Sequence, residues 1–236
     1  MLRSLERVAW RLRVVLLALA AGCVDAVGFL NLFHIFTAHL SGDTTKLAVD
    51  LGSGHFGVDA LAFVLVLVTY VGGVVLGVVV VAADERRSRA LLVAEILCLL
   101  ALMTLGSALR DGGGLHHGGF FFYFLVVLSA LAMGLQTAYL RRTAGTSVHT
   151  TFITGMLTAL AEDAVAWGRN HADAEARHRV GVHGSIWLGY LAGGIVGALL
   201  TIELDFAFWA LAFPLVLLAV VLVEDRFVTP SSYPSR

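Results

Sequence analysis

The sequence predicts an all-α, polytopic membrane protein with six transmembrane helices plus two re-entrant or half helices, arranged as an inverted-topology repeat. Of its 236 residues 58% are hydrophobic and the mean hydropathy is +0.87, so too little polar surface is left to coat a soluble domain of this size. Six apolar stretches are long enough to cross a bilayer, and a polar, hydroxyl-rich motif occurs twice between them.

Each of the six stretches carries few charges and has about the 20 residues that a transmembrane helix needs. They are Val14 to Phe33, Ala60 to Ala83, Ala90 to Leu109, Phe120 to Leu140, Ser185 to Ile202 and Phe206 to Val223. The first stretch has a second interpretation, because residues 19–23 also fit a lipobox, with Cys23 lipidated after cleavage. The apolar run continues through residues 24–30 instead of becoming a polar tether, which favours a complete span.

The repeated motif relates residues 37–50 to residues 150–163 at a constant offset of 113. The matched positions are Thr37 with Thr150, Ser41 with Thr154, Gly42 with Gly155, Thr45 with Thr158 and Asp50 with Asp163. A second pair lies downstream, where Tyr70 precedes Gly73 and Gly77, and Tyr190 precedes Gly193 and Gly197. The chain is therefore predicted to have two related halves, residues 1–112 and 113–236, with re-entrant motifs at 37–52 and 149–168.

The distribution of Lys and Arg residues over the two sides of the membrane distinguishes a topology with six spans from one with eight. With six spans, one side holds the chain start, residues 86–89, Arg141 and Arg142, the segment 169–184 and the chain end, which is 14 of the 16 Lys and Arg residues. If both motifs also spanned the membrane, only about ten Lys and Arg residues would lie on the cytoplasmic side. The positive-inside rule favours six spans, with both termini cytoplasmic in a bacterial inner membrane. The second half then enters from the opposite side to the first, as in secondary transporters with inverted repeats.

Four motifs together resemble a known family. They are Gly22 to Leu30, Phe36 to Thr44, Gly134 to Ala138 and Thr150 to Gly155, and in their order and spacing the chain is similar to the YoaK family of bacterial inner-membrane proteins. The resemblance covers nearly the whole chain and implies six spans, but no substrate. Two departures stand out: the family pattern has Thr-Gly-Asn where this chain has Ser41, Gly42 and Asp43, and Gln-Asn-Ala where it has Gln136, Thr137 and Ala138. Asp43 adds a negative charge that puts a shared ligand preference in doubt.

The candidate site combines the two motifs with a carboxylate in the first span. Asp25 lies at membrane depth, where a charge costs at least roughly 2.5–3.5 kcal/mol, so it is either a proton or cation site or a hydrogen-bonded link between helices. The motif hydroxyls could face a ligand, while the glycines could permit a turn with positive φ or a close backbone approach. The predicted substrate- or ion-binding residues are Asp25, Ser41, Gly42, Asp43, Thr44, Thr45, Gln136, Thr151, Thr154, Gly155 and Thr158. The alternative is that each motif only caps a re-entrant helix.

Other polar residues favour structural interpretations. Glu95 is five residues inside its span, where snorkelling toward the interface is at least as well supported as a functional role. The amide of Gln136 is expected to bond a neighbouring helix. The Gly73/Gly77 and Gly193/Gly197 faces indicate close packing between halves or between chains of a homo-oligomer. Residues 169–179 are interpreted as a solvated loop, so their histidines predict no metal site.

Two function classes remain. The first is a small transporter or channel for a small molecule or ion, with a midplane site formed by the two motifs and Asp25. The second is a membrane scaffold or sensor that does not transport. No nucleotide-binding, zinc-protease or serine-hydrolase motif is present, so we expect no enzyme activity and no cofactor, and the lipid bilayer rather than nucleic acid as partner.

Overall fold

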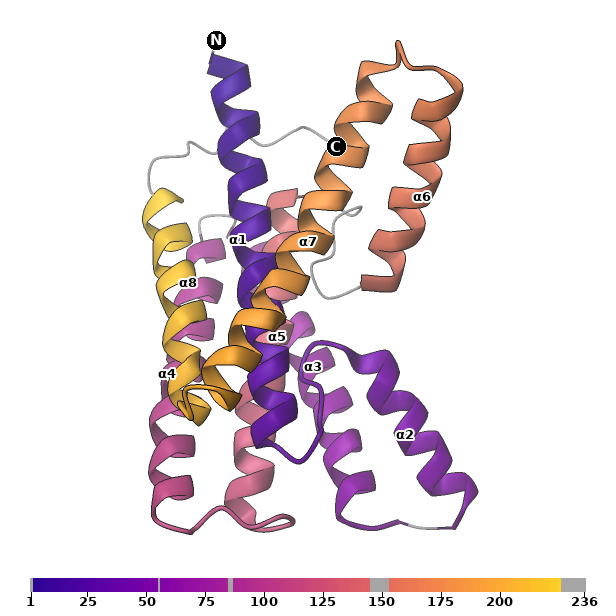
Figure 1. Cartoon of the computed structure of the whole chain (residues 1–236). Helices are drawn as coiled ribbons and strands as arrows, with labels where there is room; N and C mark the ends of the chain where they lie inside the picture. Colours follow the sequence, from indigo (N-terminus) through magenta and orange to yellow (C-terminus); the bar gives the residue numbers. More distant parts are fainter. Residues whose placement is uncertain (1, 55, 85–86, 145–152, 226–236) are drawn as a thin grey trace.

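The computed structural model describes residues 2–54, 56–84, 87–144 and 153–225, and these residues are helical with short connections and no strand (Figure 1). In chain order the helices are α1 (Leu2–Asn31), α2 (Leu40–Gly52), α3 (Val58–Ala83), α4 (Ser88–Asp111), α5 (Phe120–Ala144), α6 (Ile153–Arg169), α7 (Ala174–Ile202), the 3-10 helix η2 (Ala207–Leu211) and α8 (Ala212–Glu224).

The six predicted spans are confirmed as long apolar helices. They are Val8–Asn31, Val58–Ala83, Ser88–Asp111, Phe120–Arg141, Ala174–Ile202 and the continuous run Ala207–Glu224. The start of α1 and the end of α8 lie at the same end of the bundle, called the upper end from here on, and α1 ends at the lower end (Figure 1). An even number of spans requires this arrangement.

The interpretation of residues 169–179 as a loop is wrong. α6 continues to Arg169 and α7 begins at Ala174, so only four residues connect them. The side chain of Asp173 caps α7 by accepting hydrogen bonds from the backbone N–H groups of residues 175 and 176. Arg179 then bonds Asp163 of α6 at 2.7 Å. The charges that resembled a solvated loop instead hold a helical hairpin together.

Two helices are too short to cross a bilayer with the others. α2 has 13 residues and α6 has 17, which correspond to about 20 and 25 Å against a hydrocarbon core of about 30 Å. α2 packs on α3, and α6 packs on α7. In Figure 1 they lie on the same side of the bundle: α2 runs from mid-height to the lower end, whereas α6 runs from mid-height to the upper end.

Glycines set the two closest helix crossings. A Cβ atom on Gly22 of α1 would lie 2.0 Å from the carbonyl oxygen of Tyr190, and one on Gly193 of α7 would lie 1.9 Å from that of Leu19. At the crossing of α3 and α5, a Cβ on Gly134 would lie 2.4 Å from the carbonyl oxygen of Tyr70, and one on Gly77 would lie 2.4 Å from the Cβ of Ala138. The backbones touch at these points, as small residues permit in membrane bundles.

The Gly73/Gly77 and Gly193/Gly197 faces are therefore occupied within the chain, by α5 and α1 respectively. They pack one predicted half against the other and leave no room there for another copy. Association of copies through any other face stays a prediction.

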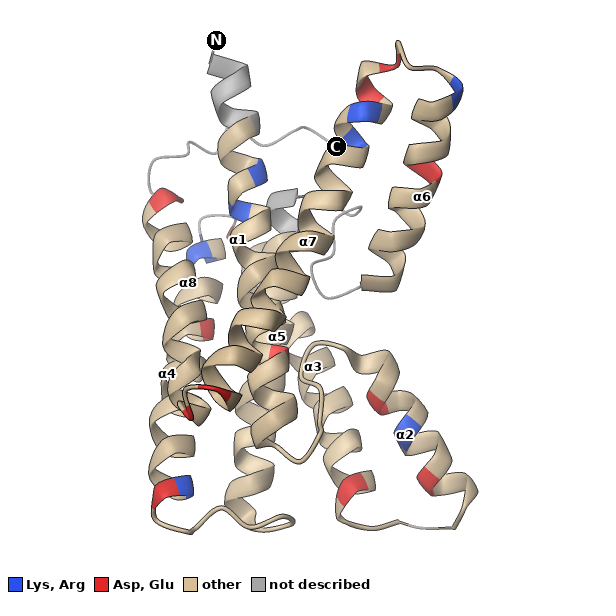
Figure 2. Cartoon of the chain, in the orientation of Figure 1, with Lys and Arg blue, Asp and Glu red and all other residues tan. Residues whose placement is uncertain are grey.

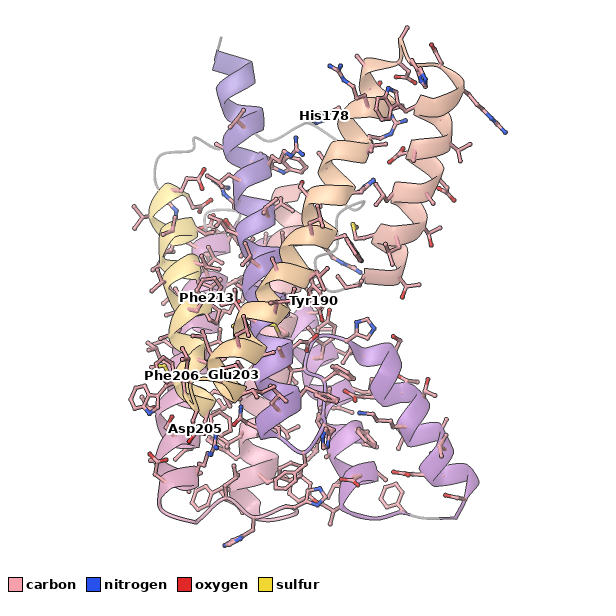
Figure 3. The ribbon with its side chains drawn as sticks, in the orientation of Figure 1. His178, Tyr190, Glu203, Asp205, Phe206 and Phe213 are labelled. Atoms are coloured by element: carbon pink, nitrogen blue, oxygen red, sulfur yellow. The ribbon has the colours of Figure 1, made fainter. Side chains whose placement is uncertain are left out.

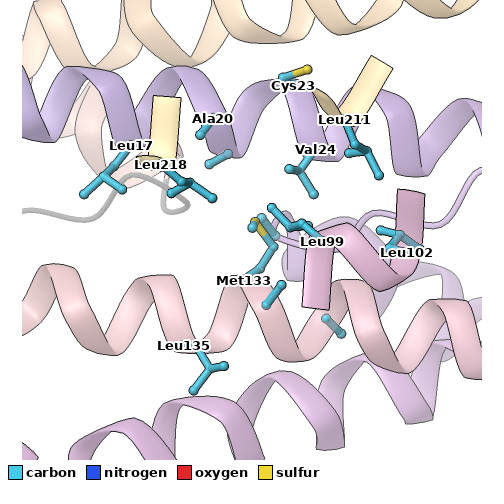
Figure 4. Close-up of a cluster of buried hydrophobic side chains, with 14 of the residues drawn as sticks. Leu17, Ala20, Cys23, Val24, Leu99, Leu102, Met133, Leu135, Leu211 and Leu218 are labelled. Carbon is cyan, nitrogen blue, oxygen red and sulfur yellow. The ribbon is translucent and has the colours of Figure 1, made fainter. Parts of the chain in front are cut away.

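The apolar core lies where α1, α4, α5, η2 and α8 converge (Figure 4). Leu17, Leu99, Met133, Leu211 and Leu218 are among its fully buried side chains. The remaining apolar surface of the spans, such as Val75 and Val79 on α3, is exposed in the isolated chain, as expected for helices that face lipid.

A buried ion cluster near the upper end joins four helices. Asp225, which follows α8, accepts hydrogen bonds from Arg13 of α1 at 3.0 Å, Arg89 of α4 at 3.1 Å and the Tyr139 hydroxyl of α5 at 3.2 Å. Arg89 also bonds the carbonyl oxygen of Asp225. Of the described Lys and Arg side chains, only Lys46 and Arg110 belong to the lower part of the bundle, and the others gather toward the upper end (Figure 2).

Candidate functional site

Asp25 is the centre of a polar cluster at mid-height. Its side chain is only 3% exposed, and its carboxylate accepts four hydrogen bonds. Oδ1 accepts from the backbone N–H groups of Thr37 at 2.8 Å and Ala38 at 2.7 Å and from the Thr37 hydroxyl at 3.2 Å, while Oδ2 accepts from the Tyr190 hydroxyl at 2.5 Å. These bonds satisfy both oxygens of a side chain that is removed from water.

Asp25 connects three parts of the chain. It lies on α1, Thr37 and Ala38 lie on the segment that leads into α2, and Tyr190 lies on α7. Figure 3 places Tyr190 at mid-height of the bundle, between His178 toward the upper end of α7 and Glu203 toward its lower end. Of the two interpretations left open for Asp25, these contacts match the link between helices directly.

The chain turn between α1 and α2 explains how two backbone N–H groups reach Asp25. α1 ends at Asn31, and Phe33 and His34 adopt φ values of 54° and 65°, which reverse the chain. His39 at the N-cap of α2 makes no side-chain capping bond. Asp25 therefore accepts from two buried backbone N–H groups of the turn that precedes the N-cap of α2, which satisfies them without a helix of their own.

Lys46 lies in an aromatic cage beside this cluster. Its ammonium is 5.0 Å from the ring centre of Phe36, 5.4 Å from that of Phe63 and 5.7 Å from that of Phe29, and it donates to the carbonyl oxygen of His34 at 2.5 Å. Three rings around one cation are a favourable electrostatic arrangement. The cage holds α2 against α1 and α3.

Asp43 lies next to Lys46 and is fully buried. Its Oδ1 accepts from the Phe36 N–H at 3.4 Å and lies 3.6 Å from the Lys46 ammonium, whereas Oδ2 has no hydrogen-bond partner. Burial raises the pKa of Asp43 to about 7, and the neighbouring Lys46 limits the rise. The charge that distinguishes this chain from the family pattern is thus close to its protonation midpoint at neutral pH.

The hydroxyls of three motif threonines are bonded within their own helices. Thr44 and Thr45 donate to carbonyl oxygens one turn earlier in α2, and Thr158 does the same in α6, with Thr45 to Ser41 and Thr158 to Thr154 as equivalent pairs. The side chains of Ser41, Thr44, Thr45, Thr154 and Thr158 are exposed in the isolated chain.

Of the two uses considered for Gly42 and Gly155, the turn with positive φ is not found. Both lie inside helices, Gly42 in α2 and Gly155 in α6, and neither has a positive φ. A Cβ on Gly42 would lie 3.4 Å from the ring of Phe36, so its small size only permits ordinary packing.

The predicted site residues are brought together only in part. Gln136 is fully buried and donates to the carbonyl oxygen of Leu17 at 2.8 Å, as expected for an amide that bonds a neighbouring helix, and its Oε1 has no partner. Of the described motif hydroxyls only that of Thr37 bonds Asp25, and no hydrogen bond joins Asp25 to Gln136 or to the described hydroxyls of α2 and α6. Thr151 and its neighbour Thr150 lie outside the described residues.

Sequence reasoning missed the partners of Asp25. Thr37 and Tyr190 were visible as repeated positions but not as ligands of a carboxylate. Asp163, considered for the second motif, instead bonds Arg179 and the Nδ1 atom of His183, at 2.8 Å from the latter. Among the described side chains no three His, Cys, Asp or Glu residues form a group that could hold a metal ion.

Glu95 corrects another expectation. It does not snorkel: its side chain is 0% exposed, and neither carboxyl oxygen has a hydrogen-bond partner among the described residues. The residue faces the inside of the bundle, and the distance along the sequence to the helix end does not reveal this orientation.

An open hollow of about 400 Å³ lies toward the lower end, apart from Asp25. It is lined by Leu30, Asn31, Phe33, His34, Arg110, Leu115, Thr201 and Ile202. Arg110 is held there by Asn31 at 3.2 Å and by Asp205 at 3.0 Å.

Comparison with known proteins gives a family and one curated relative. Residues 13–223 match the family described as Protein of unknown function (DUF1275). The chain is 27% identical over 148 residues to the UPF0700 transmembrane protein YoaK of Bacillus subtilis (strain 168), and the match spans 63% of this chain and 64% of that protein. No solved structure matches.

Proposed function

We propose that this chain, which belongs to the family described as Protein of unknown function (DUF1275), is a small membrane transporter or channel whose site is centred on Asp25 at mid-height. The observation that carries the proposal is the Asp25 carboxylate, which connects α1 to α7 and to the entrance of the half-length helix α2. Burying a charge at this depth costs free energy. A carboxylate that accepts hydrogen bonds from several separate helices can control their relative positions.

An inverted repeat is the architecture that best accounts for the helix contacts. α1 and α5 are the first spans of the two halves, and α3 and α7 are the second spans. The first span of each half crosses the second span of the other, α1 on α7 and α5 on α3, while each half helix packs on the second span of its own half. Opposite directions of α2 and α6 in Figure 1 agree with this symmetry.

The two crossings also share their chemistry. At one, Gly22 approaches the carbonyl of Tyr190, whose hydroxyl bonds Asp25. At the other, Gly134 approaches the carbonyl of Tyr70, whose hydroxyl lies 2.8 Å from that of Thr137. Gly22 and Gly134 are each followed three positions later by the polar partner, which makes Thr137 the counterpart of Asp25. The same contact with a tyrosine would then be made by the carboxyl group of Asp25 in one half and by the hydroxyl of Thr137 in the other.

The proposed orientation puts the upper end in the cytoplasm of a bacterial inner membrane. Positive side chains gather at that end of the described structure, where the start of α1 and the end of α8 also lie (Figure 2).

Thiol labelling of intact cells tests this orientation. In a background with Cys23→Ala and Cys98→Ala, we expect Ser53→Cys after α2 and His116→Cys after α4 to react with an impermeant maleimide, because both positions are exposed at the lower end. Ala174→Cys, exposed at the start of α7, should react only after cell lysis. Labelling of Ala174→Cys in intact cells would overturn the orientation.

In the proposed cycle, the Asp25 link is the element that moves. A solute or ion that competes for Tyr190 or for the N–H groups of Thr37 and Ala38 would release α2 from α1 and α7. The exposed hydroxyls of α2 and α6 would then contact the solute, after giving up their bonds within the helix.

Asp25→Asn is the variant that tests the site. The amide oxygen can still accept from Thr37 and Ala38, and the Tyr190 hydroxyl can accept from the amide N–H, so we expect a loss of only about 1–2 kcal/mol in stability. A screen of ions and small polar solutes would measure uptake into proteoliposomes and ligand-dependent thermal stabilisation. Asp25→Asn should abolish any uptake or stabilisation that the screen finds. Asp50→Asn, which changes a half-exposed residue of α2, should retain it. A response that survives Asp25→Asn would make Asp25 a structural residue.

The alternative function is a scaffold or sensor that does not transport. It is favoured by the observation that Asp25 already has four protein donors and that the motif threonines bond their own helices. A complete absence of uptake and stabilisation in the screen would favour this alternative.

A further inference from the structure

Glu95 is an ionisable group that the proposed site does not use. It lies two turns inside α4, is completely buried, and has no hydrogen bond to either carboxyl oxygen among the described residues. Buried polar groups are almost always paired, so an unpaired carboxyl in a membrane helix needs an explanation.

No positive side chain bonds Glu95 among the described residues. α4 packs against α3, α5, η2 and α8. Near the upper end of these helices Arg89 and Tyr139 both bond Asp225, and Glu224 at the end of α8 is a second acidic group, whose Oε2 is buried without a hydrogen bond in the described structure. On α3, Tyr70 pairs with Thr137. Cys98 lies one turn further along α4, and Arg110 bonds Asn31 and Asp205 at the lower end.

These surroundings favour the neutral form. A carboxylate without a counter-charge or donor cannot persist in a dry, apolar interior, whereas the carboxylic acid can. Release of the proton therefore requires water to reach Glu95, and water can reach it only if α4 separates from the helices that cover it.

We propose that Glu95 is a proton-binding site, occupied in the packed form of the bundle and emptied when α4 separates from α5 and α8. Its role in transport rests on the proposed function, in which the proton would be the coupling ion. Proton release and helix separation are then coupled in one equilibrium. A rise in pH shifts this equilibrium toward the separated form.

Accessibility of a cysteine on the same face of α4 tests the coupling. Leu99, one turn after Glu95, is also completely buried. In the background lacking Cys23 and Cys98, the full-length Leu99→Cys variant in lipid vesicles would be labelled with a water-soluble maleimide between pH 6 and pH 9. Its rate would be divided by that of the exposed Ser53→Cys variant, because thiolate formation itself rises with pH.

With Glu95 present, the ratio should rise at least tenfold across this range. With Glu95→Gln, which cannot ionise, it should stay within twofold. The same rise in both backgrounds would overturn the proposal, as would the absence of a rise when Glu95 is present.

Unfolding measured without the Leu99 change provides an independent check. A group protonated in the folded state and ionised when exposed stabilises the fold at low pH, and this contribution is lost as pH rises. The thermal midpoint of the unmodified chain in detergent should therefore fall more steeply from pH 5 to pH 9 than that of Glu95→Gln. Asp43 contributes a dependence of the same sign in both proteins, so their difference reports Glu95. Equal slopes would overturn the proposal.

These measurements use no solute, so they separate the two proposals. A pH response that depends on Glu95, together with a screen that finds no solute, would retain the proton site and refute transport. If a solute is taken up, a proton ionophore and Glu95→Gln should each abolish its accumulation. Accumulation that neither one changes would refute the role of Glu95 in coupling.

Discussion

Gly193→Ala should destabilise the protein by about 3 kcal/mol or more, because the added Cβ would lie 1.9 Å from the carbonyl oxygen of Leu19. The obstacle is helix backbone, which cannot rotate away as a side chain can. α1 and α7 would have to move apart, and this would also pull Tyr190 from Asp25. Unfolding in mixed micelles, followed by intrinsic fluorescence, measures the loss.

The adjacent glycine is the matched control. A Cβ on Gly194 would lie 3.6 Å from the carbonyl oxygen of Gly22, which is ordinary contact. Gly194→Ala should therefore leave stability unchanged or raise it slightly, since alanine is the better helix former. If the two variants lose the same stability, the described crossing of α1 and α7 is wrong.

Asp225→Asn should cost about 3–5 kcal/mol, because Asp225 is an anionic partner of the buried Arg13 and also bonds Arg89. The side chains of Arg13 and Asp225 are 3% and 4% exposed, so solvent cannot compensate for the loss. The same unfolding measurement applies, and the upper ends of α1, α4 and α8 should separate first.

An exposed ion pair provides the comparison for Asp225. Arg110 and Asp205 are 42% and 83% exposed, so Asp205→Asn should cost no more than about 1 kcal/mol. Similar losses for Asp205→Asn and Asp225→Asn would contradict the burial of the cluster.

Much of the fold could be predicted because lipid is a simple solvent. Spanning segments must satisfy their backbone internally and expose apolar side chains, so composition and length alone locate the six helices. Where polar residues interrupted this pattern, the prediction was less accurate. Residues 169–179 resembled a loop by composition, but the pairing of Arg179 with Asp163 makes most of them helical.

The candidate site was predictable in its centre but not in its contacts. The cost of burying a charge made Asp25 conspicuous, and the repeat drew attention to α2 and α6. The cage of Phe29, Phe36 and Phe63 around Lys46 had no signal in the sequence, because its rings come from α1, the following turn and α3.

The sequence by itself determined the membrane class, the six spans and the family, because hydropathy and motif order are properties of the linear chain. Only the tertiary structure decided the roles of individual polar residues. Asp25 and Tyr190 are 165 positions apart yet hydrogen-bonded, and Glu95 faces inward without a hydrogen bond in the part of the chain that is described. A polar group's role depends on which neighbours remove it from water and which replace the lost hydrogen bonds, and helix packing sets both.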